Sequence, residues 1–378
     1  MKMKVFAALL MAGALVCAPV AGAAETPAGG GIQSVSAAEI TLLSNGDSVY
    51  VGGVALTGST ESPAYATTDT SGNVITKGAT AANYNIKWDG STLTLKDAYI
   101  TKGVSTPDYS SPVEGAAIGV FSTIGNAELT IQLAGSNTVD ASKASKGVHV
   151  YSSSGTATLN ITGSGSLNAS GFQSGIQVQS NSNNATLTIQ GAVVGATVSS
   201  ASGDGVFVQA GGSSSASLSV DGGSLIATGK SDYGAGIRYT FGSSSSGSGT
   251  PSLTVSGNAM VKASGGEGGI RDNSSADIQI GDGNNSSGGI VFDNGTGTVY
   301  GDVTLQDNLT VGEGESLTIP DGASLNANGK LTVDGGTITG NVSGGVTYKV
   351  TGVSLDKDSL TLEAGKSGTL TAAITPDN

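Results

Sequence analysis

One unit recurs along this chain of 378 residues, and its period constrains the fold more than any other feature. Each copy holds a Gly-aliphatic-x-aliphatic run, a stretch of small polar residues, a Leu-x-Ile or Leu-x-Val triplet and a Gly-rich corner. The runs start at Gly147, Gly175 and Gly205, and looser copies start at Gly236 and Gly269. Successive starts are therefore 28, 30, 31 and 33 residues apart, and such a period is typical of a solenoid.

Each unit is expected to form three short strands. Aliphatic and small polar residues alternate within the runs, as in Val148-His149-Val150, and a strand with one buried face requires this alternation. Three strands in each turn of about 30 residues predict an all-β fold, a parallel β-helix that we expect to be right-handed. From Leu309 onward the Leu-containing strands come only six to eight residues apart, which predicts small final coils.

The N-terminus has the pattern of a secretory signal peptide over residues 1–24. Two lysines precede an apolar run from Val5 to Val16, and small residues follow at 21–24. The apolar run is shorter than the roughly 20 residues of a membrane span, and the bulky Val16 argues against lipidation of Cys17. Cleavage would remove Cys17, the single cysteine of the chain, and leave no disulfide in the mature protein.

Composition narrows the possible partners. The formal net charge is −13, with 29 acidic and 16 basic residues, so we expect a surface that repels nucleic acid. No segment after the signal peptide is apolar enough to span a membrane. Residues 25–40 are rich in Ala, Gly and Thr and are expected to be a disordered leader, so that the β-helix with its N-terminal cap covers residues 41–345.

The first ordered segments are expected to cap the solenoid. Residues 48–56 predict a hairpin, and the segment from Tyr84 to Leu95 predicts the opening of the first coil. Trp88 is the single tryptophan. We expect it to cover the open end of this coil, because a solenoid needs an atypical terminal repeat over its core. Stacking of Trp88 on a sugar is the alternative.

The pattern changes near residue 346. Two short strands, the turn Gly365-Lys366-Ser367 between them and the closing Thr375-Pro376 resemble the opening of a bacterial Ig-like group 2 domain. The resemblance implies that residues 346–378 are the start of a β-sandwich, which needs roughly 100 residues when complete. It also implies a cell-surface setting, since such domains occur as stalk modules of adhesins, and it leads us to expect a fragment of a longer protein.

The solenoid itself resembles secreted, non-catalytic bacterial β-helix surface proteins. The segment from Asn85 to Leu95 and the repeated Gly-Ile and Gly-Val runs carry this resemblance. The group includes carbohydrate-binding proteins that bind polyuronates. The resemblance therefore implies binding or adhesion, with a polysaccharide or a host or cell-wall glycan as the partner.

The repeat also predicts which side chains stack on the outside. In each Gly-aliphatic-x-aliphatic strand the residue x points outward, and equivalent residues on neighbouring coils lie side by side. The single histidine and the two arginines of the chain share one such column. The expected first column is Gly119, His149, Gln177, Phe207, Arg238, Arg271 and Val291, and the second is Phe121, Tyr151, Gln179, Gln209, Thr240, Asn273 and Asp293.

This column suggests a site for an acidic polysaccharide. Stacked arginines repel each other, whereas an anionic ligand would reverse that sign because Arg binds a carboxylate through two parallel hydrogen bonds. Asp272 falls where other coils place an inward Val, so it needs a strand bulge or a partner such as a lysine, an arginine or a metal. The alternative is a solvated strand face whose arginines pair with nearby acids. The candidate ligand-binding residues are Arg238, Arg271, His149, Tyr151, Gln177, Phe207 and Asp272.

The sequence offers less support for catalysis. Glycan-cleaving β-helix enzymes need clustered carboxylates, whereas the aspartates of these coils are scattered, so we expect no catalytic residues. Calcium is conceivable at Asp282-Gly283-Asn284-Asn285 or at Asp293-Asn294, although neither an EF-hand loop nor a nonapeptide repeat is present. We therefore expect a binding protein without an obligatory cofactor. A structural spacer and a polysaccharide lyase are the alternative functions.

Overall fold

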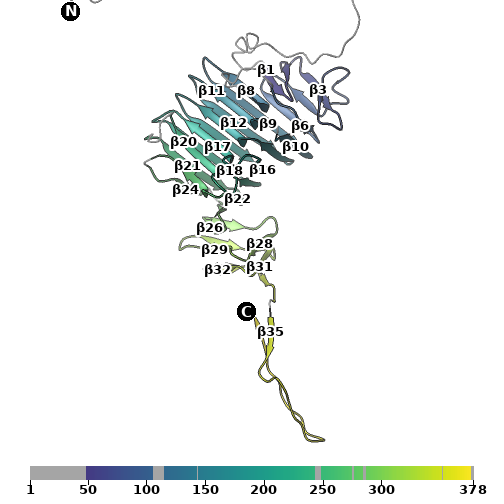
Figure 1. Ribbon diagram of the computed structural model, residues 1–378, viewed down its shortest axis with the longest axis vertical. Helices are drawn as coiled ribbons and strands as arrows, with labels where there is room; N and C mark the ends of the chain where they lie inside the picture. Colours follow the sequence, from purple (N-terminus) through teal and green to yellow (C-terminus); the bar gives the residue numbers. More distant parts are fainter. Residues whose placement is uncertain are drawn as a thin grey trace, which may run out of the picture. The chain divides into compact units, whose positions relative to one another are not determined.

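A computed structural model describes residues 48–104, 115–142, 144–242, 248–274, 276–283, 287–350 and 352–375. Across these ranges the chain is built from strands, β1 to β36, without a helix (Figure 1). It follows that none of the described segments is a helix long and apolar enough to cross a membrane. The signal peptide expected at 1–24 and the leader expected at 25–40 lie outside the described residues.

Three sheets form the main solenoid, and each coil contributes one strand to each sheet. The first sheet contains the strands of the repeated Gly run, β8 (Ala116–Ser122), β11 (Lys146–Ser152), β14 (Ser174–Ser180), β17 (Asp204–Ala210), β20 (Ala235–Phe241) and β23 (Gly268–Asp272). The second sheet contains β9 (Ala127–Ala134), β12 (Ala157–Gly163), β15 (Ala185–Gln190), β18 (Ser215–Asp221), β21 (Thr250–Ser256) and β24 (Gln279–Gly281). The third sheet contains β7 (Tyr99–Ile100), β10 (Ser136–Ala141), β13 (Ser166–Gly171), β16 (Val193–Val198), β19 (Ser224–Thr228), β22 (Ala259–Ser264) and β25 (Gly289–Asp293).

Neighbouring coils are parallel and in register, which confirms the predicted coil structure. Val148 pairs with Ile176 in the first sheet, and Leu159 pairs with Leu187 in the second. These aliphatic side chains are completely buried in one continuous core. The alternation of buried and outward residues therefore follows the alternation of the sequence.

Antiparallel strands cap the N-terminal end. The hairpin predicted at 48–56 is β1 (Ser48–Val51) and β2 (Val54–Thr57), whose turn uses Gly52 and Gly53 at φ 60° and 81°. Strand β1 pairs antiparallel with β8. The strands β3 (Ala64–Thr68), β4 (Val74–Ile75), β5 (Ile86–Trp88) and β6 (Thr92–Lys96) pair antiparallel with one another, and β6 begins the parallel stack by pairing with β9.

Trp88 belongs to the core of this cap. Its side chain is 1% exposed and lies in the main cluster of buried residues, while its backbone pairs with Ala64 and Leu93. The expected role in covering the first coil is consistent with this position. A buried ring cannot stack on a sugar, so the alternative role is excluded.

A second set of smaller coils, which the short strand spacing predicted, follows a reversal of the chain that the sequence did not predict. Strand β25 pairs antiparallel with β26 (Thr296–Tyr300), and the chain direction in the third sheet is opposite from there on. β29 (Ser316–Thr318) and β32 (Thr337–Thr339) extend this sheet. Two further three-stranded sheets are β27 (Asp302–Thr304), β30 (Ser324–Asn326) and β33 (Val342–Ser343), and β28 (Leu309–Gly312), β31 (Leu331–Asp334) and β34 (Val346–Tyr348). Because β34 pairs with β31, the small coils end after Tyr348 rather than at 345.

The two sets of coils use opposite faces of the third sheet. In β25, Val291 belongs to the core of the main solenoid, whereas the adjacent Ile290 and Phe292 belong to the core of the small coils. Neighbouring residues of a strand point to opposite faces. Because the strand direction and the buried face both change at β25, the sense of winding is the same in the two solenoids.

The last described strands form a separate hairpin. β35 (Gly352–Leu355) pairs antiparallel with β36 (Ala372–Thr375) and with no other described strand. The apolar side chains of Leu355, Leu360 and Leu362 in this segment are exposed.

Candidate functional site

The register confirms most of the two predicted columns on the first sheet. From Gly119 to Arg271, each member of the first column lies beside the next. Val291 and Asp293 were placed wrongly. They lie in β25 of the third sheet, because the first sheet ends at β23 and the last coil turns without a further strand there.

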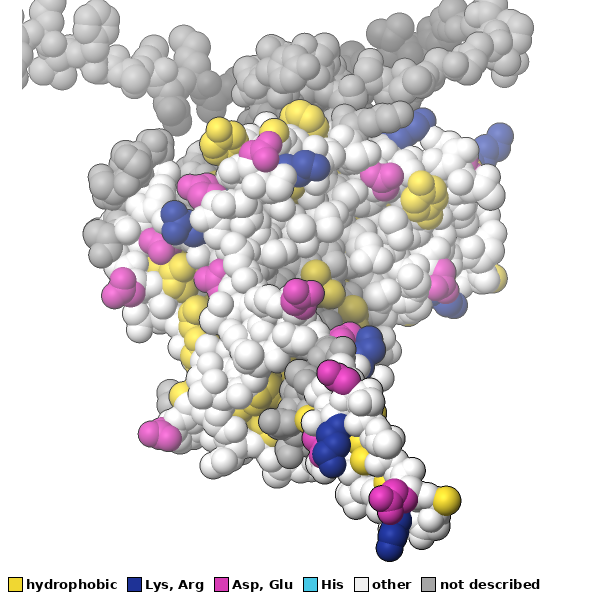
Figure 2. Space-filling model, turned by 60° about the horizontal axis from the view of Figure 1, so that its bottom comes forward, with side chains coloured by type: hydrophobic (Ala, Val, Ile, Leu, Met, Phe, Trp, Pro, Cys, Tyr) yellow, Lys and Arg dark blue, Asp and Glu magenta, His cyan; other side chains and the backbone are white. Residues whose placement is uncertain are grey.

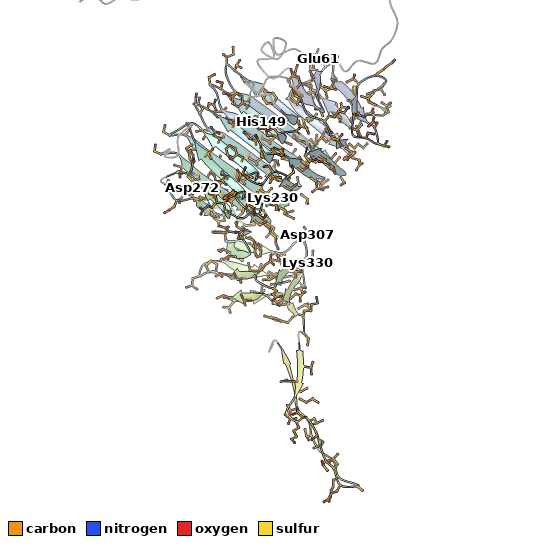
Figure 3. The ribbon with its side chains drawn as sticks, viewed as in Figure 1. Glu61, His149, Lys230, Asp272, Asp307 and Lys330 are labelled. Atoms are coloured by element: carbon orange, nitrogen blue, oxygen red, sulfur yellow. The ribbon has the colours of Figure 1, made fainter. Side chains whose placement is uncertain are left out.

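His149 is not on an exposed stripe, contrary to expectation. Figure 3 labels this residue. Its side chain is 1% exposed and lies between the rings of Phe121 and Tyr151, with centroids 5.4 and 6.0 Å away. Phe121 also contacts Tyr50 of the cap hairpin. The physical reason is an outer apolar cluster: β1 lies beside β8, and its aromatic side chain extends the cover over this face.

The buried imidazole has unusual electrostatics. Neither ring nitrogen of His149 has a hydrogen-bond partner among the described residues. Burial, with a smaller contribution from the positive charge of Lys146, holds the pKa of His149 well below its usual value. The ring is therefore neutral at physiological pH and unavailable to a surface ligand.

Tyr151 and Gln177 belong to a chain of side-chain hydrogen bonds. Gln177 Nε2 donates to Gln179 Oε1 at 2.7 Å, and Gln179 Nε2 donates to Asn181 Oδ1 at 3.0 Å. Asn181 Nδ2 then donates to Tyr151 Oη at 2.8 Å. Ser174 Oγ donates to Gln177 Oε1 at 3.1 Å. The polar groups of this part of the column thus satisfy one another.

Arg238 is paired with acids of its own chain. Its Nε donates to Asp204 Oδ2 at 2.9 Å, and its second guanidinium nitrogen donates to Glu267. Asp204 is buried and also accepts a hydrogen bond from Ala235 N at 2.8 Å. Burial raises the pKa of Asp204, while the hydrogen bond from Arg238 opposes that rise. Arg238 therefore follows the alternative prediction, in which the arginines of this strand face pair with nearby acids.

Arg271 and Asp272 differ from this pattern. Arg271 is exposed and has no ion pair with any residue that the structure describes. Asp272 is the last residue of β23, and its Oδ1 accepts hydrogen bonds from Ser274 N and Ser274 Oγ, both at 2.8 Å (Figure 3). The aspartate is therefore part of a turn at the strand end and not an unpaired inward carboxylate. The facing Tyr239 is inward, and its hydroxyl donates to Ser252 O at 3.0 Å.

The calcium candidates offer no assembled site. Asn284 and Asn285 lie outside the described residues. Asp293 Oδ1 accepts a hydrogen bond from Ile270 N, and Asn294 bonds the backbone of Gly265 through both its amide oxygen and its amide nitrogen. No group of three or more His, Cys, Asp or Glu side chains that would hold a metal occurs in the described ranges.

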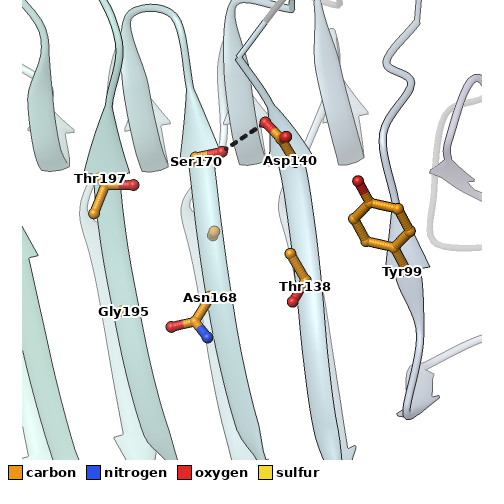
Figure 4. Close-up of a pocket in the computed structure, with 8 residues that line it drawn as sticks. Tyr99, Thr138, Asp140, Asn168, Ser170, Gly195 and Thr197 are labelled. Atoms are coloured by element: carbon orange, nitrogen blue, oxygen red, sulfur yellow. Dashed lines mark hydrogen bonds between the residues drawn. The ribbon is translucent and has the colours of Figure 1, made fainter. Parts of the chain in front are cut away.

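A trough lies on the outer face of the third sheet, and its residues were not singled out from the sequence. It has a volume of about 420 Å³ and crosses β7, β10, β13 and β16 (Figure 4). The lining residues are Tyr99, Thr138, Asp140, Asn168, Ala169, Ser170, Gly195 and Thr197. The sequence signal that identifies them is the same alternation, applied to this sheet: Tyr99, Thr138, Asn168 and Gly195 form one column in register.

The shape of the trough depends on Gly195. A Cβ at this position would lie 2.6 Å from Asn168 Oδ1, so a side chain here would displace the amide. Tyr99 stands at the other end of the column and is 39% exposed. The hydroxyls of Thr138 and Thr197 and the amide of Asn168 have no hydrogen-bond partner among the described residues. The trough therefore presents an aromatic ring and several free donors and acceptors.

Comparison with known proteins found no match for this chain: it matches no family model, no curated protein and no solved structure.

Proposed function

We propose that this chain is a secreted, non-catalytic binding or adhesion protein that holds a polysaccharide in the trough of the third sheet. One observation carries the proposal. The polar side chains of Thr138, Asn168 and Thr197 have no partner among the described residues, whereas the outer side chains around Gln177 and Arg238 are bonded to their own chain. Free hydroxyl and amide groups beside an exposed aromatic ring suit a sugar, which is apolar on its ring faces and polar at its edges.

A glycan array with matched variants tests the proposal. Tyr99→Ala and Asn168→Ala should each lower the affinity for the bound glycan by about three- to tenfold, through loss of ring contact or of hydrogen bonds. Tyr233→Ala removes another exposed tyrosine, and Asn160→Ala removes an outward asparagine of the second sheet. These two control variants should bind as the wild type does.

A structural spacer is the alternative function. The mutual hydrogen bonding of outer side chains on the first sheet favours it, because a surface that satisfies its own polar groups needs no ligand. Wild-type protein that binds nothing on the array, with and without calcium, would establish the spacer over the binding protein. Equal losses of glycan affinity in the trough variants and in their controls would mean that the ligand binds elsewhere. Arg271 and Phe207 of the first sheet would then be the next residues to substitute.

The proposal includes a cell-surface setting. The signal-like pattern of residues 1–24 supports secretion. The resemblance of residues 346–378 to an Ig-like group 2 domain is supported by the antiparallel pair β35 and β36, and the exposed Leu355 and Leu362 would pack against the second sheet of a sandwich. Nucleic acid is an unsuitable partner at a net charge of −13, and the face in Figure 2 shows charged side chains of both signs scattered among uncharged surface.

We also propose that the solenoid is right-handed. Connections between parallel strands of one sheet are right-handed in about 98% of cases, and each coil is such a connection. An experimental structure of the full chain tests both the handedness of the solenoid and the proposal that residues 346–378 begin an Ig-like domain. Left-handed coils, or a helix between β35 and β36, would contradict them.

A further inference from the structure

Two exposed aliphatic side chains border the trough at its Gly195 end. Val193 and Ile226 are 47% and 46% exposed. Both point outward from the third sheet, since Val193 precedes Gly195 by two residues in β16 and Ile226 pairs with Gly195 from β19. They therefore lie roughly 7 and 5 Å from Gly195 at the backbone.

These two side chains interrupt a polar part of the sheet face. Ser166 and Ser224 lie beside Val193 on the neighbouring strands. In the described part of the chain, neither Val193 nor Ile226 is among the side chains that pack against the core of the small coils. Nearly half of the surface of each residue thus stays in water, and its burial against a ligand would be favourable.

The amide of Asn168 leans over Gly195 between the trough and this apolar border. The three atoms nearest to a Cβ placed at Gly195 all belong to Asn168, with Oδ1 at 2.6 Å (Figure 4). This amide has no hydrogen-bond partner among the residues that the structure describes. A free donor and a free acceptor are therefore presented next to two exposed aliphatic side chains.

We propose that this end of the trough binds the acetamido group of an N-acetylated amino sugar, an inference that rests on the proposed function. The carbonyl oxygen of the acetamido group accepts a hydrogen bond from Asn168 Nδ2, and its methyl group packs on Val193 and Ile226. A hexose carries a hydroxyl at the same ring position, so it leaves both aliphatic side chains in water. This recognition uses no charge, unlike that of the acidic glycan which the arginine column on the first sheet suggested.

The methyl contact sets the size of the expected preference. A hexose hydroxyl can also bond to Asn168, so the hydrogen bond alone discriminates little. Burial of one methyl group changes an affinity by about fourfold, and we expect an overall preference of about three- to tenfold for the acetylated sugar. Added salt should leave this preference unchanged, because salt screens only interactions between charges.

Calorimetry on the full chain tests the preference with identically linked tetrasaccharides of N-acetylglucosamine and of glucose, and with the matching galactose pair. Val193→Thr and Ile226→Thr keep a β-branched side chain in the strand and place a hydroxyl on the apolar border, so each should bring the ratio of the two affinities toward one. Ile124→Thr makes the same change at a position that is 66% exposed between β8 and β9, and it should leave the ratio unchanged. The ratio is the readout, because a general loss of affinity would affect both members of a pair equally.

The outcomes separate this inference from the proposed function. Plain hexoses bound as tightly as the acetylated sugars, or a preference that Val193→Thr and Ile226→Thr both leave intact, would refute the acetamido site and leave glycan binding standing. Absence of binding to every probe and to the array would refute both. A preference for the acetylated sugar that these variants reduce and Ile124→Thr preserves supports both.

Discussion

Acidification should destabilise the main solenoid through His149. The imidazole is buried between Phe121 and Tyr151, with no hydrogen-bond partner among the described residues. Burial, and secondarily the positive charge of Lys146, holds its pKa well below the ordinary histidine value of about 6.5. The unfolded chain takes up a proton near that value while the folded chain does not, so unfolding binds a proton and stability is lost as the pH falls below about 6.5.

The size of this effect follows from linkage. A histidine that stays unprotonated when folded and titrates normally when unfolded reduces the free energy of unfolding by up to about 1.9 kcal/mol between pH 7 and pH 5. His149→Phe removes both the proton site and the two unpartnered nitrogens, and it keeps an aromatic edge toward Phe121. It should therefore abolish this part of the pH dependence and raise stability at pH 7 by about 1 to 2 kcal/mol.

Urea titration of the full chain measures both effects, with the fluorescence of the buried Trp88 as the signal. The difference between wild type and His149→Phe at each pH isolates the histidine, because other groups titrate equally in both proteins. Asp204, whose pKa burial raises, would act with the opposite sign by taking up a proton in the folded state first. Equal pH dependence of the two proteins between pH 7 and 5 would refute the argument.

Three further substitutions test the structure at other points. Arg238→Ala should lower the free energy of unfolding by about 2 to 3 kcal/mol, because it leaves the buried carboxylate of Asp204 without its counter-ion. In the same urea titration, the double variant that also carries Asp204→Asn should recover part of that loss. Tyr239→Phe removes a hydroxyl that donates to a backbone carbonyl at 3.0 Å and should cost about 1 kcal/mol; an unchanged midpoint would show that water replaces the bond. Gly195→Val places a side chain where Asn168 now lies and should weaken glycan binding by about tenfold or more, with the circular dichroism spectrum unchanged; full affinity would place the ligand outside the trough.

The coil structure could be predicted because the repeat encodes it locally. Each aliphatic pair such as Val148 and Val150 must face inward, and a separate Gly-rich stretch marks the corner, so the period and the alternation together define a coil. Register follows from stacking equivalent residues, as the pairs from Gly119 to Arg271 confirm. The cap hairpin was equally predictable, because Gly52 and Gly53 suit a two-residue turn.

The environment of the outward residues could not be predicted in the same way. Alternation shows that His149 points outward, but its burial depends on Tyr50 and Phe121, which reach it from a different strand and a different coil. Arg238 finds its acids one coil earlier and one coil later, at Asp204 and Glu267. Such contacts depend on side-chain conformations between coils, which the period of a repeat does not contain.

The trough exists because the outer face of the third sheet changes its role along the solenoid. In the early coils its column holds Thr138, Asn168 and Gly195, and this face meets solvent. By β25 the same column holds Phe292, which is buried in the core of the small coils. Ile226, 46% exposed, stands between the two regions. A face that must become a core cannot remain polar throughout, so the polar trough is restricted to the early coils and a bound chain would meet an apolar border at Ile226.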